Sequence, residues 1–283
     1  MTKISLGTAQ WGLNYGISNS SGIPSIKDIK NLISFARANK ITMLDTANSY
    51  GEVESKLGEI GIDDFDTITK IHVSKGQSNK IENLIKISIH NMGLNSIYGC
   101  LVHNPQELLK DSKIWEALKK EKDKKRITKI GYSVYEPEVL SRLLEKNMFP
   151  DVVQLPYSIL DRKFESLIKF LKEEKVEIHA RSIFLQGLYF LKLNKLPATL
   201  KPLKKPLKKI KNISRINSLT MLELCISFVL KNNNIDFVVV GVENLEQLKE
   251  IKNFFQTGIK LKKVDDSILN LSFDKKLLNP TNW

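Results

Sequence analysis

Three short β-forming runs of the sequence each end in a side chain that can hold or transfer a proton. The end residues are Asp45, Lys70 and His103, and Tyr50 follows the first of them closely. The carboxyl ends of strands in α/β folds meet at the edge of the sheet where such folds keep their chemistry. Each residue alone has a structural explanation, as a helix cap, a solvated strand end, a hydrogen-bonded histidine or a rim aromatic. Together they predict a proton-donor site.

The type of each side chain indicates its role in such a site. A tyrosine has a reference pKa of about 10, which is too high for an efficient acid near neutral pH. A nearby ammonium group stabilises the phenolate, so we expect Lys70 to lower the pKa of Tyr50. Asp45 would hold Lys70 in place, and His103 would hydrogen-bond the substrate oxygen or the phenol. None of these groups can supply a hydride, so reduction of a carbonyl requires a bound cofactor.

The predicted elements that position these residues alternate between strand and helix along the whole chain. This pattern of eight strand–helix pairs is typical of an α/β fold, the (β/α)8 TIM barrel, here as one domain over residues 1–283. The expected strands are residues 4–8, 41–45, 67–70, 97–103, 127–133, 152–155, 177–184 and 237–240. The expected helices are residues 25–40, 52–59, 79–92, 114–122, 137–145, 164–174, 219–230 and 245–255.

Two segments interrupt this alternation. Residues 191–216 contain three prolines and a run of lysines, and we expect a long loop there, on the face that follows the strands. The loop is either a solvated segment of a lysine-rich chain or a lid that closes over an anionic ligand. Residues 257–283 continue past the last repeat as a C-terminal tail.

The composition argues against several other classes of protein. The chain has 44 basic and 31 acidic residues, but its charge of +13 is spread along the sequence without a nucleic-acid-binding motif, so no nucleic-acid partner is expected. The sequence lacks a long apolar run and a signal-peptide pattern, which predicts a cytoplasmic protein without membrane spans. Cys100 and Cys225 are expected to be buried free thiols, and no metal-ligand spacing is present. The sequence does not indicate an oligomeric state.

The order and spacing of the four proton-donor residues resemble the catalytic tetrad of the aldo-keto reductase superfamily. The matching segments are residues 45–51, 68–71 and 101–105, and the wider resemblance covers about residues 4–255. It implies an NAD(P)H-dependent oxidoreductase that reduces an aldehyde or ketone to an alcohol, with Tyr50 as the general acid. Two alternatives stay open. One is a reductase of a free or nucleotide-linked sugar in surface-polysaccharide synthesis, and the other is a dinucleotide-binding regulatory barrel without turnover.

The resemblance also assigns cofactor contacts at the strand ends. Ser133 and Gln154 are similar to contacts of the nicotinamide carboxamide, with ordinary strand-end hydrogen bonding as the alternative, and Val134 stands where many relatives have Asn. Arg181 falls where many relatives have a tyrosine that stacks on nicotinamide, and a guanidinium can stack, bind phosphate or form a structural ion pair. The implied set is Gly7, Thr8, Ser133, Gln154, Arg181, Ser182, Gly241, Asn244, Gln247 and Glu250.

The last part of this set concerns the adenosine end of the cofactor. Residues 241–250 resemble the segment whose helix N-terminus binds the adenosine phosphate end. The family prefers NADPH, so NADPH is expected. NADH stays possible because Glu243 argues against a 2′-phosphate and Ile251 departs from a common Asn.

Overall fold

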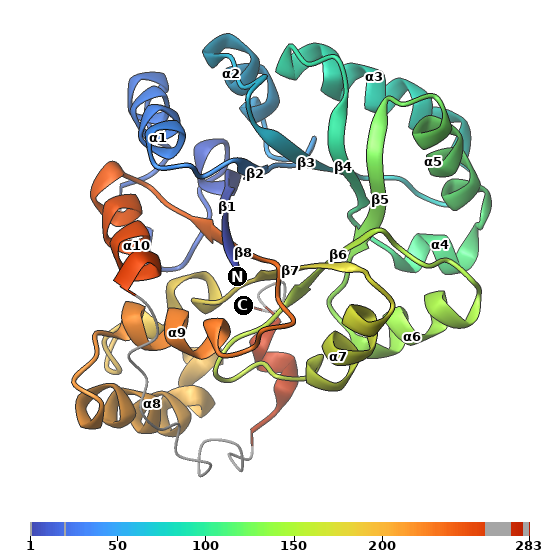
Figure 1. Ribbon diagram of the computed structural model, residues 1–283. Helices are drawn as coiled ribbons and strands as arrows, with labels where there is room; N and C mark the ends of the chain where they lie inside the picture. Colours follow the sequence, from blue (N-terminus) through green and yellow to red (C-terminus); the bar gives the residue numbers. More distant parts are fainter. Residues whose placement is uncertain (1, 20, 258–272, 280–282) are drawn as a thin grey trace.

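The computed structural model describes residues 2–19, 21–257, 273–279 and 283, and it is a closed barrel of eight parallel strands surrounded by helices (Figure 1). The strands follow one another around the barrel in sequence order. They are β1 (Lys3–Gly7), β2 (Met43–Asp45), β3 (Asp66–Ile71), β4 (Ile97–Val102), β5 (Ile127–Ser133), β6 (Val152–Pro156), β7 (Glu177–Arg181) and β8 (Phe237–Gly241). The predicted (β/α)8 barrel is confirmed.

The helices pack around the outside of the strands (Figure 1). They are α1 (Ile26–Ala38), α2 (Val53–Ile60), α3 (Ile81–Met92), α4 (Gln106–Lys110), α5 (Lys113–Asp123), α6 (Pro137–Glu145), α7 (Glu165–Glu173), α8 (Lys204–Ile216), α9 (Met221–Leu230) and α10 (Leu245–Thr257). Short 3-10 turns are η1 (Ala9–Trp11), η2 (Ser78–Lys80), η3 (Leu185–Phe190), η4 (Ala198–Leu203) and η6 (Lys275–Leu278).

Helix α1 illustrates how sequence pattern becomes packing. Ser25 accepts a hydrogen bond from the backbone of Asp28, whose side chain accepts one from the Ser25 backbone in return, so α1 begins with a full capping box. The apolar face of α1 is buried against the barrel, where burial of such side chains is the main favourable term in folding. Its buried residues are Ile29, Leu32, Ile33 and Ala36.

The strand ends predicted to carry chemistry lie side by side in the barrel. Gly7 of β1 is in register with Asp45 of β2 and with Gly241 of β8. Ser133 of β5 is in register with Gln154 of β6. Below them, the barrel interior is filled by a small apolar cluster of Met43, Ile68, Leu101, Val152 and Phe237. The strand ends therefore rest on a packed interior, which holds their side chains in fixed positions.

The segment expected as a long loop contains a helix, so the loop prediction for residues 191–216 is wrong over much of its length. Helix α8 begins at Lys204, and its exposed residues include Lys205 and Lys208. Pro206 lies in the first turn, where a backbone N–H would have no intrahelical acceptor, so a proline is tolerated. The helix buries Pro206, Leu207, Ile210 and Ile213, and this helical spacing of apolar residues explains why it forms.

Strand β7 ends earlier than expected, at Arg181 rather than at residue 184. Ser182 has a left-handed backbone with φ of 57°, which turns the chain out of the strand. Most of the predicted tail, residues 257–283, lies outside the described residues, although Leu278 in η6 is buried.

Both cysteines are buried free thiols, as expected. Among the described residues, no single helix has the length and apolar character of a membrane span. The segments Ala198–Ile216 and Met221–Leu230 reach that length and composition only together, across a bend of 90°.

Candidate active site

Asp45 and Lys70 form a buried ion pair at the ends of β2 and β3. Lys70 Nζ lies 2.7 Å from Asp45 Oδ2, and the two side chains are only 1% and 5% exposed, respectively. The ammonium also donates to the Thr46 carbonyl at 2.9 Å, and Gln154 Nε2 donates to Asp45 Oδ1 at 2.7 Å. Each charge in a buried pair compensates the other, and further hydrogen bonds restrict both side chains. The ion pair therefore gives the site a rigid support.

Tyr50 approaches this pair from the loop between β2 and α2. Lys70 Nζ donates to the Tyr50 hydroxyl at 3.4 Å. Two glycines make the approach possible. Gly51 has a left-handed φ of 64°, and a Cβ added at Gly12 would lie 1.9 Å from the Tyr50 carbonyl oxygen. The local backbone thus places the phenol beside the ammonium, as the sequence pattern suggested.

His103 completes the group at the end of β4. Its ring lies edge-on to the ring of Tyr50, with centroids 6.1 Å apart, and Ser49 Oγ lies 3.4 Å from its Nδ1. Burial, followed by the nearby Lys70 charge, lowers the pKa of His103 to about 4. The imidazole is therefore neutral near pH 7, so it can orient a polar ligand atom without adding a charge.

The pKa of Tyr50 moves in the direction opposite to the expectation. Burial raises it, and the Asp45 carboxylate raises it further. Lys70, which is paired with Asp45 at 2.7 Å, does not reverse this effect. The phenol consequently keeps its proton at neutral pH, which is the state that a proton donor requires.

A pocket of about 440 Å³ opens at this rim of the barrel, and we call it the rim pocket. Most of the predicted cofactor set lines it. From the predicted residues, its lining includes Gly7, Asp45, Tyr50, Gln154, Arg181, Ser182, Gly241, Gln247 and Glu250. The remaining predicted residues are not in its lining, namely Thr8, Lys70, His103, Ser133 and Asn244.

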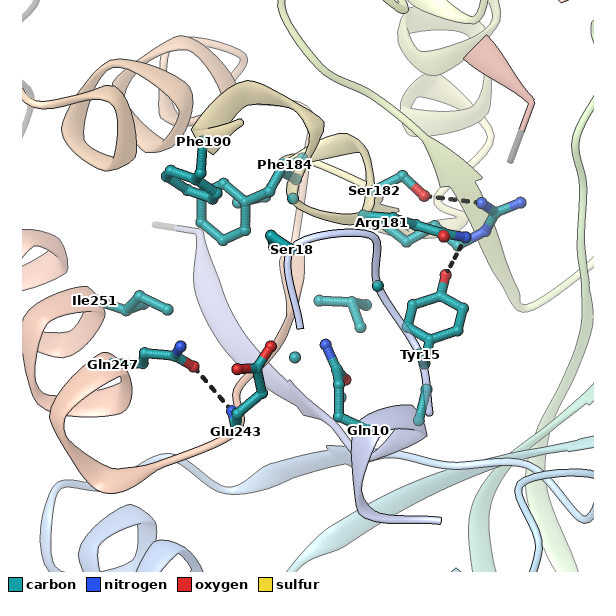
Figure 2. Close-up of a pocket in the computed structure, with 18 of the residues that line it drawn as sticks. Gln10, Tyr15, Ser18, Arg181, Ser182, Phe184, Phe190, Glu243, Gln247 and Ile251 are labelled. Carbon is teal, nitrogen blue, oxygen red and sulfur yellow. Dashed lines mark hydrogen bonds between the residues drawn. The ribbon is translucent and has the colours of Figure 1, made fainter. Parts of the chain in front are cut away.

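Two of the residues outside the lining support residues within it. The hydroxyl of buried Thr8 donates to the Asp45 carbonyl at 3.0 Å. Asn244 Oδ1 accepts from the backbone of Gln247 at 3.0 Å, which caps the start of α10. Gln247 in turn accepts from the backbone N–H of Glu243 at 2.8 Å (Figure 2). These bonds fix the end of the rim pocket that α10 forms.

A second group of lining residues, which the sequence did not predict, lies on the segments after β1 and β7 and at the start of α9. A hydrogen bond of 3.0 Å from Gln186 Nε2 to the Tyr15 hydroxyl ties the β1 and β7 loops together. The missed residues include Gln10, Tyr15, Ser18, Phe184, Gln186, Phe190 and Met221. Loop shape depends on contacts between segments far apart in sequence, so no local pattern identified them.

The β7 loop has an unusual backbone. Ser182, Leu185 and Gln186 have φ values of 57°, 46° and 51°, and Gly187 follows at 91°. Non-glycine residues in this left-handed region cost of order 1–3 kcal/mol each when strained, and such residues cluster at ligand sites.

In the part of the chain that the structure describes, no group of His, Cys, Asp or Glu side chains is arranged to hold a metal ion.

Comparisons with known proteins identify the family and agree with the fold. A model of the aldo/keto reductase family matches residues 3–267. No curated protein sequence matches the chain. Solved structures share its fold. The aldo-keto reductase AKR11C1 of Bacillus halodurans (holo form) has 18% identity and a TM-score of 0.74, covering 90% of this chain and 86% of its own.

A second similar structure is the aldo-keto reductase AKR2E5 of the silkworm, Bombyx mori. It has 18% identity and a TM-score of 0.65, with 94% of this chain and 81% of that chain covered. Because the family model spans nearly the whole sequence, the chain belongs to the aldo/keto reductase family. Proteins of this family are oxidoreductases that use NAD(P)H on small carbonyl compounds.

Proposed function

We propose that this protein reduces an aldehyde or ketone to an alcohol with a nicotinamide dinucleotide, and that Tyr50 is the proton donor. The observation that carries the proposal is the position of the Tyr50 phenol, which borders the rim pocket and receives a hydrogen bond from Lys70 at 3.4 Å. Lys70 is held by Asp45 at 2.7 Å.

The volume and the lining of the rim pocket support its assignment as a cofactor site. Its volume of about 440 Å³ lies in the range of ligand pockets, and it extends from Tyr50 to the start of α10. Gln154 uses its amide nitrogen on Asp45, so its oxygen is available to accept a hydrogen bond. Gln154, Ser182, Gln247 and Glu250 would hold the cofactor, which when bound supplies the hydride.

The protein's own groups handle the proton. Tyr50 donates its proton to the carbonyl oxygen, and the Lys70 ammonium stabilises the phenolate that remains. Asp45 keeps Lys70 oriented, while neutral His103 hydrogen-bonds the substrate oxygen. Because burial raises the pKa of Tyr50, release of its proton depends on the negative charge that develops on the carbonyl oxygen.

The lining of the rim pocket bears on the choice of nucleotide. The α10 end carries the carboxylates of Glu243 and Glu250, and Arg181 is the one Lys or Arg side chain in the described lining. Figure 2 shows Arg181 across the pocket from Glu243 and Gln247. A carboxylate accepts a hydrogen bond from a ribose 2′-hydroxyl but repels a 2′-phosphate. The pocket thus favours NADH, whereas the family resemblance favours NADPH.

Titration of nucleotide fluorescence measures this preference. We expect NADH to bind at least about tenfold more tightly than NADPH, a difference of about 1.4 kcal/mol. Glu243→Gln should reduce the ratio of the NADPH Kd to the NADH Kd, because it improves NADPH binding. Tighter NADPH binding to the wild-type protein would contradict the assignment of Glu243. Absence of binding by both nucleotides at millimolar concentration would remove the oxidoreductase proposal.

Substitution of the proton donor tests the reaction. Tyr50→Phe should lower turnover by on the order of 10²-fold or more, because a general acid contributes that much, while nucleotide Kd stays within about twofold. The matched control is Tyr98→Phe, since the Tyr98 hydroxyl binds Glu177 at 2.8 Å, away from the rim pocket. Wild-type turnover in Tyr50→Phe would contradict the proposal. Nucleotide binding without turnover on a carbonyl and sugar panel would favour the regulatory barrel.

A further inference from the structure

The charges of the rim pocket are unevenly distributed. Its lining contains three carboxylates, of which Asp45 is neutralised by Lys70, while Glu243 and Glu250 belong to the α10 end. The opposite side contains Arg181 (Figure 2). None of the carboxylates in the described residues lies within 4.0 Å of the Arg181 guanidinium nitrogens. The side of the pocket nearest the proposed chemistry therefore has an unbalanced positive charge.

Neighbouring acidic groups do not supply the missing counter-ion. Burial raises the pKa of Asp161. Its carboxylate lies 3.8 Å from Lys163, whose charge lowers this pKa more than the charge of Arg181 does. Burial raises the pKa of Tyr15 to about 12, so this neighbouring phenol is neutral. Tyr50 is also neutral, because burial raises its pKa. An unpaired charge that is half-buried is unfavourable, and a bound anion would relieve that cost.

The Arg181 side chain is held in place rather than extended into solvent. Its Nη2 donates to the Val134 carbonyl at 3.0 Å, and its Nη1 donates to Ser182 Oγ at 3.1 Å. Its guanidinium carbon lies 3.9 Å from the centroid of the Tyr135 ring, a cation–π contact. A guanidinium has five N–H donors, so both terminal nitrogens keep an N–H for a ligand. A fixed, planar donor of this kind matches a carboxylate or phosphate group.

Arg181 is also near the proton donor. Both residues line the rim pocket, and the charge of Arg181 acts to lower the pKa of Tyr50 against the larger effect of burial. We infer that Arg181 is an anion-binding subsite for the substrate and holds a carboxylate or phosphate group of the carbonyl compound. This inference rests on the proposed reductase function. The substrate class is an anionic aldehyde or ketone, such as a keto acid, a sugar acid or a phosphorylated sugar.

Matched substrate pairs test this subsite. The pairs are 4-carboxybenzaldehyde with its methyl ester, and glyceraldehyde 3-phosphate with glyceraldehyde, each assayed with saturating nucleotide. The wild-type enzyme should have a lower KM for the anionic member of at least one pair. Arg181→Gln should raise that KM by about tenfold or more, as expected for loss of a charge-assisted hydrogen bond, with a smaller change for the neutral member.

Two variants control for charge and geometry. Arg181→Lys keeps the charge but loses the planar fork, so its KM for the anionic substrate should fall between those of the wild type and Arg181→Gln. Arg215→Gln removes the same charge from the exposed surface of α8 and should leave both KM values unchanged. An equal change in Arg215→Gln would assign the effect to overall charge and contradict the subsite.

A cofactor phosphate is the other source of the same anion chemistry, and nucleotide titration separates the two. If Arg181→Gln weakens nucleotide binding about tenfold and alters both members of a pair equally, Arg181 binds the cofactor and the inference is wrong. It is also wrong if the wild-type enzyme does not favour any anionic member. In that case turnover of neutral aldehydes would leave the proposed reductase function intact, whereas absence of all turnover with bound nucleotide would overturn that function instead.

Discussion

His103 is the residue at which the electrostatics of the site can be measured directly. Burial lowers its pKa to about 4, whereas an unfolded histidine titrates near 6.5. Between these values the unfolded chain binds more protons than the folded protein. The free energy of unfolding should therefore rise with pH from about 4 to about 6.5 and then stop rising on account of this group.

The prediction has two readouts. The ¹⁵N chemical shifts of the His103 ring should show a midpoint well below 6.5, near 4. His103→Gln should also flatten the pH dependence of unfolding within that window, whereas His90→Gln, which removes an exposed histidine, should leave it in place. A ring midpoint of 6.5 or above would show that His103 is not buried among positive charges.

Individual residues of the site differ in how far the sequence revealed them. Asp45, Lys70 and His103 could be predicted from the sequence because each ends a β-forming run, and the strand ends of one barrel must meet. The effect of the surrounding charges on the pKa of Tyr50 could not be predicted. Lys70 was expected to lower the pKa of Tyr50, but burial and the Asp45 carboxylate raise it, and both effects depend on how the side chains pack. Tyr15 was missed because its place at the pocket depends on Gln186, far away in sequence.

At the scale of elements, the barrel pattern was predictable because strands and helices differ in the sequence spacing of their apolar residues. Helix α8 was missed because three prolines were interpreted as loop signals. Pro197 and Pro202 do precede the helix, but Pro206 lies in its first turn, where proline is tolerated. The lysines of α8 are absent from the lining of the rim pocket, so a lid made by these lysines has no support from their positions.

At the scale of the whole molecule, the two ends of the barrel contain different networks of charge. Opposite the rim pocket, Glu177 at the start of β7 is 14% exposed and binds Lys129 at 2.6 Å and His179 at 2.8 Å. Burial raises the pKa of Glu177, but hydrogen bonds from His179 and Lys129 outweigh this and lower it to about 2. Residues at this end of a TIM barrel contribute to stability rather than to chemistry.

This division predicts separable effects on stability and function. Glu177→Gln should lower the free energy of unfolding by about 3 kcal/mol, because it leaves Lys129 without its partner, while nucleotide Kd stays unchanged. The loss should be present above about pH 4.5 and shrink as pH falls towards 2, where the wild-type carboxylate is protonated. Urea unfolding measures it. Glu116→Gln, in an exposed pair with Lys119, should cost less than about 1 kcal/mol, and an equal loss in both variants would refute the division.

The pairing of β1 with β8 has a consequence for the synthesis of the chain. Lys3 is in register with Phe237, so the first strand cannot complete its hydrogen bonds until more than two hundred later residues have been made. Until then, β1 leaves an unpaired strand edge, to which other strands can add. Contacts between such distant residues also slow folding. The nascent protein is therefore exposed to aggregation until the ribosome has produced β8, and its dependence on chaperones should be greatest in that interval.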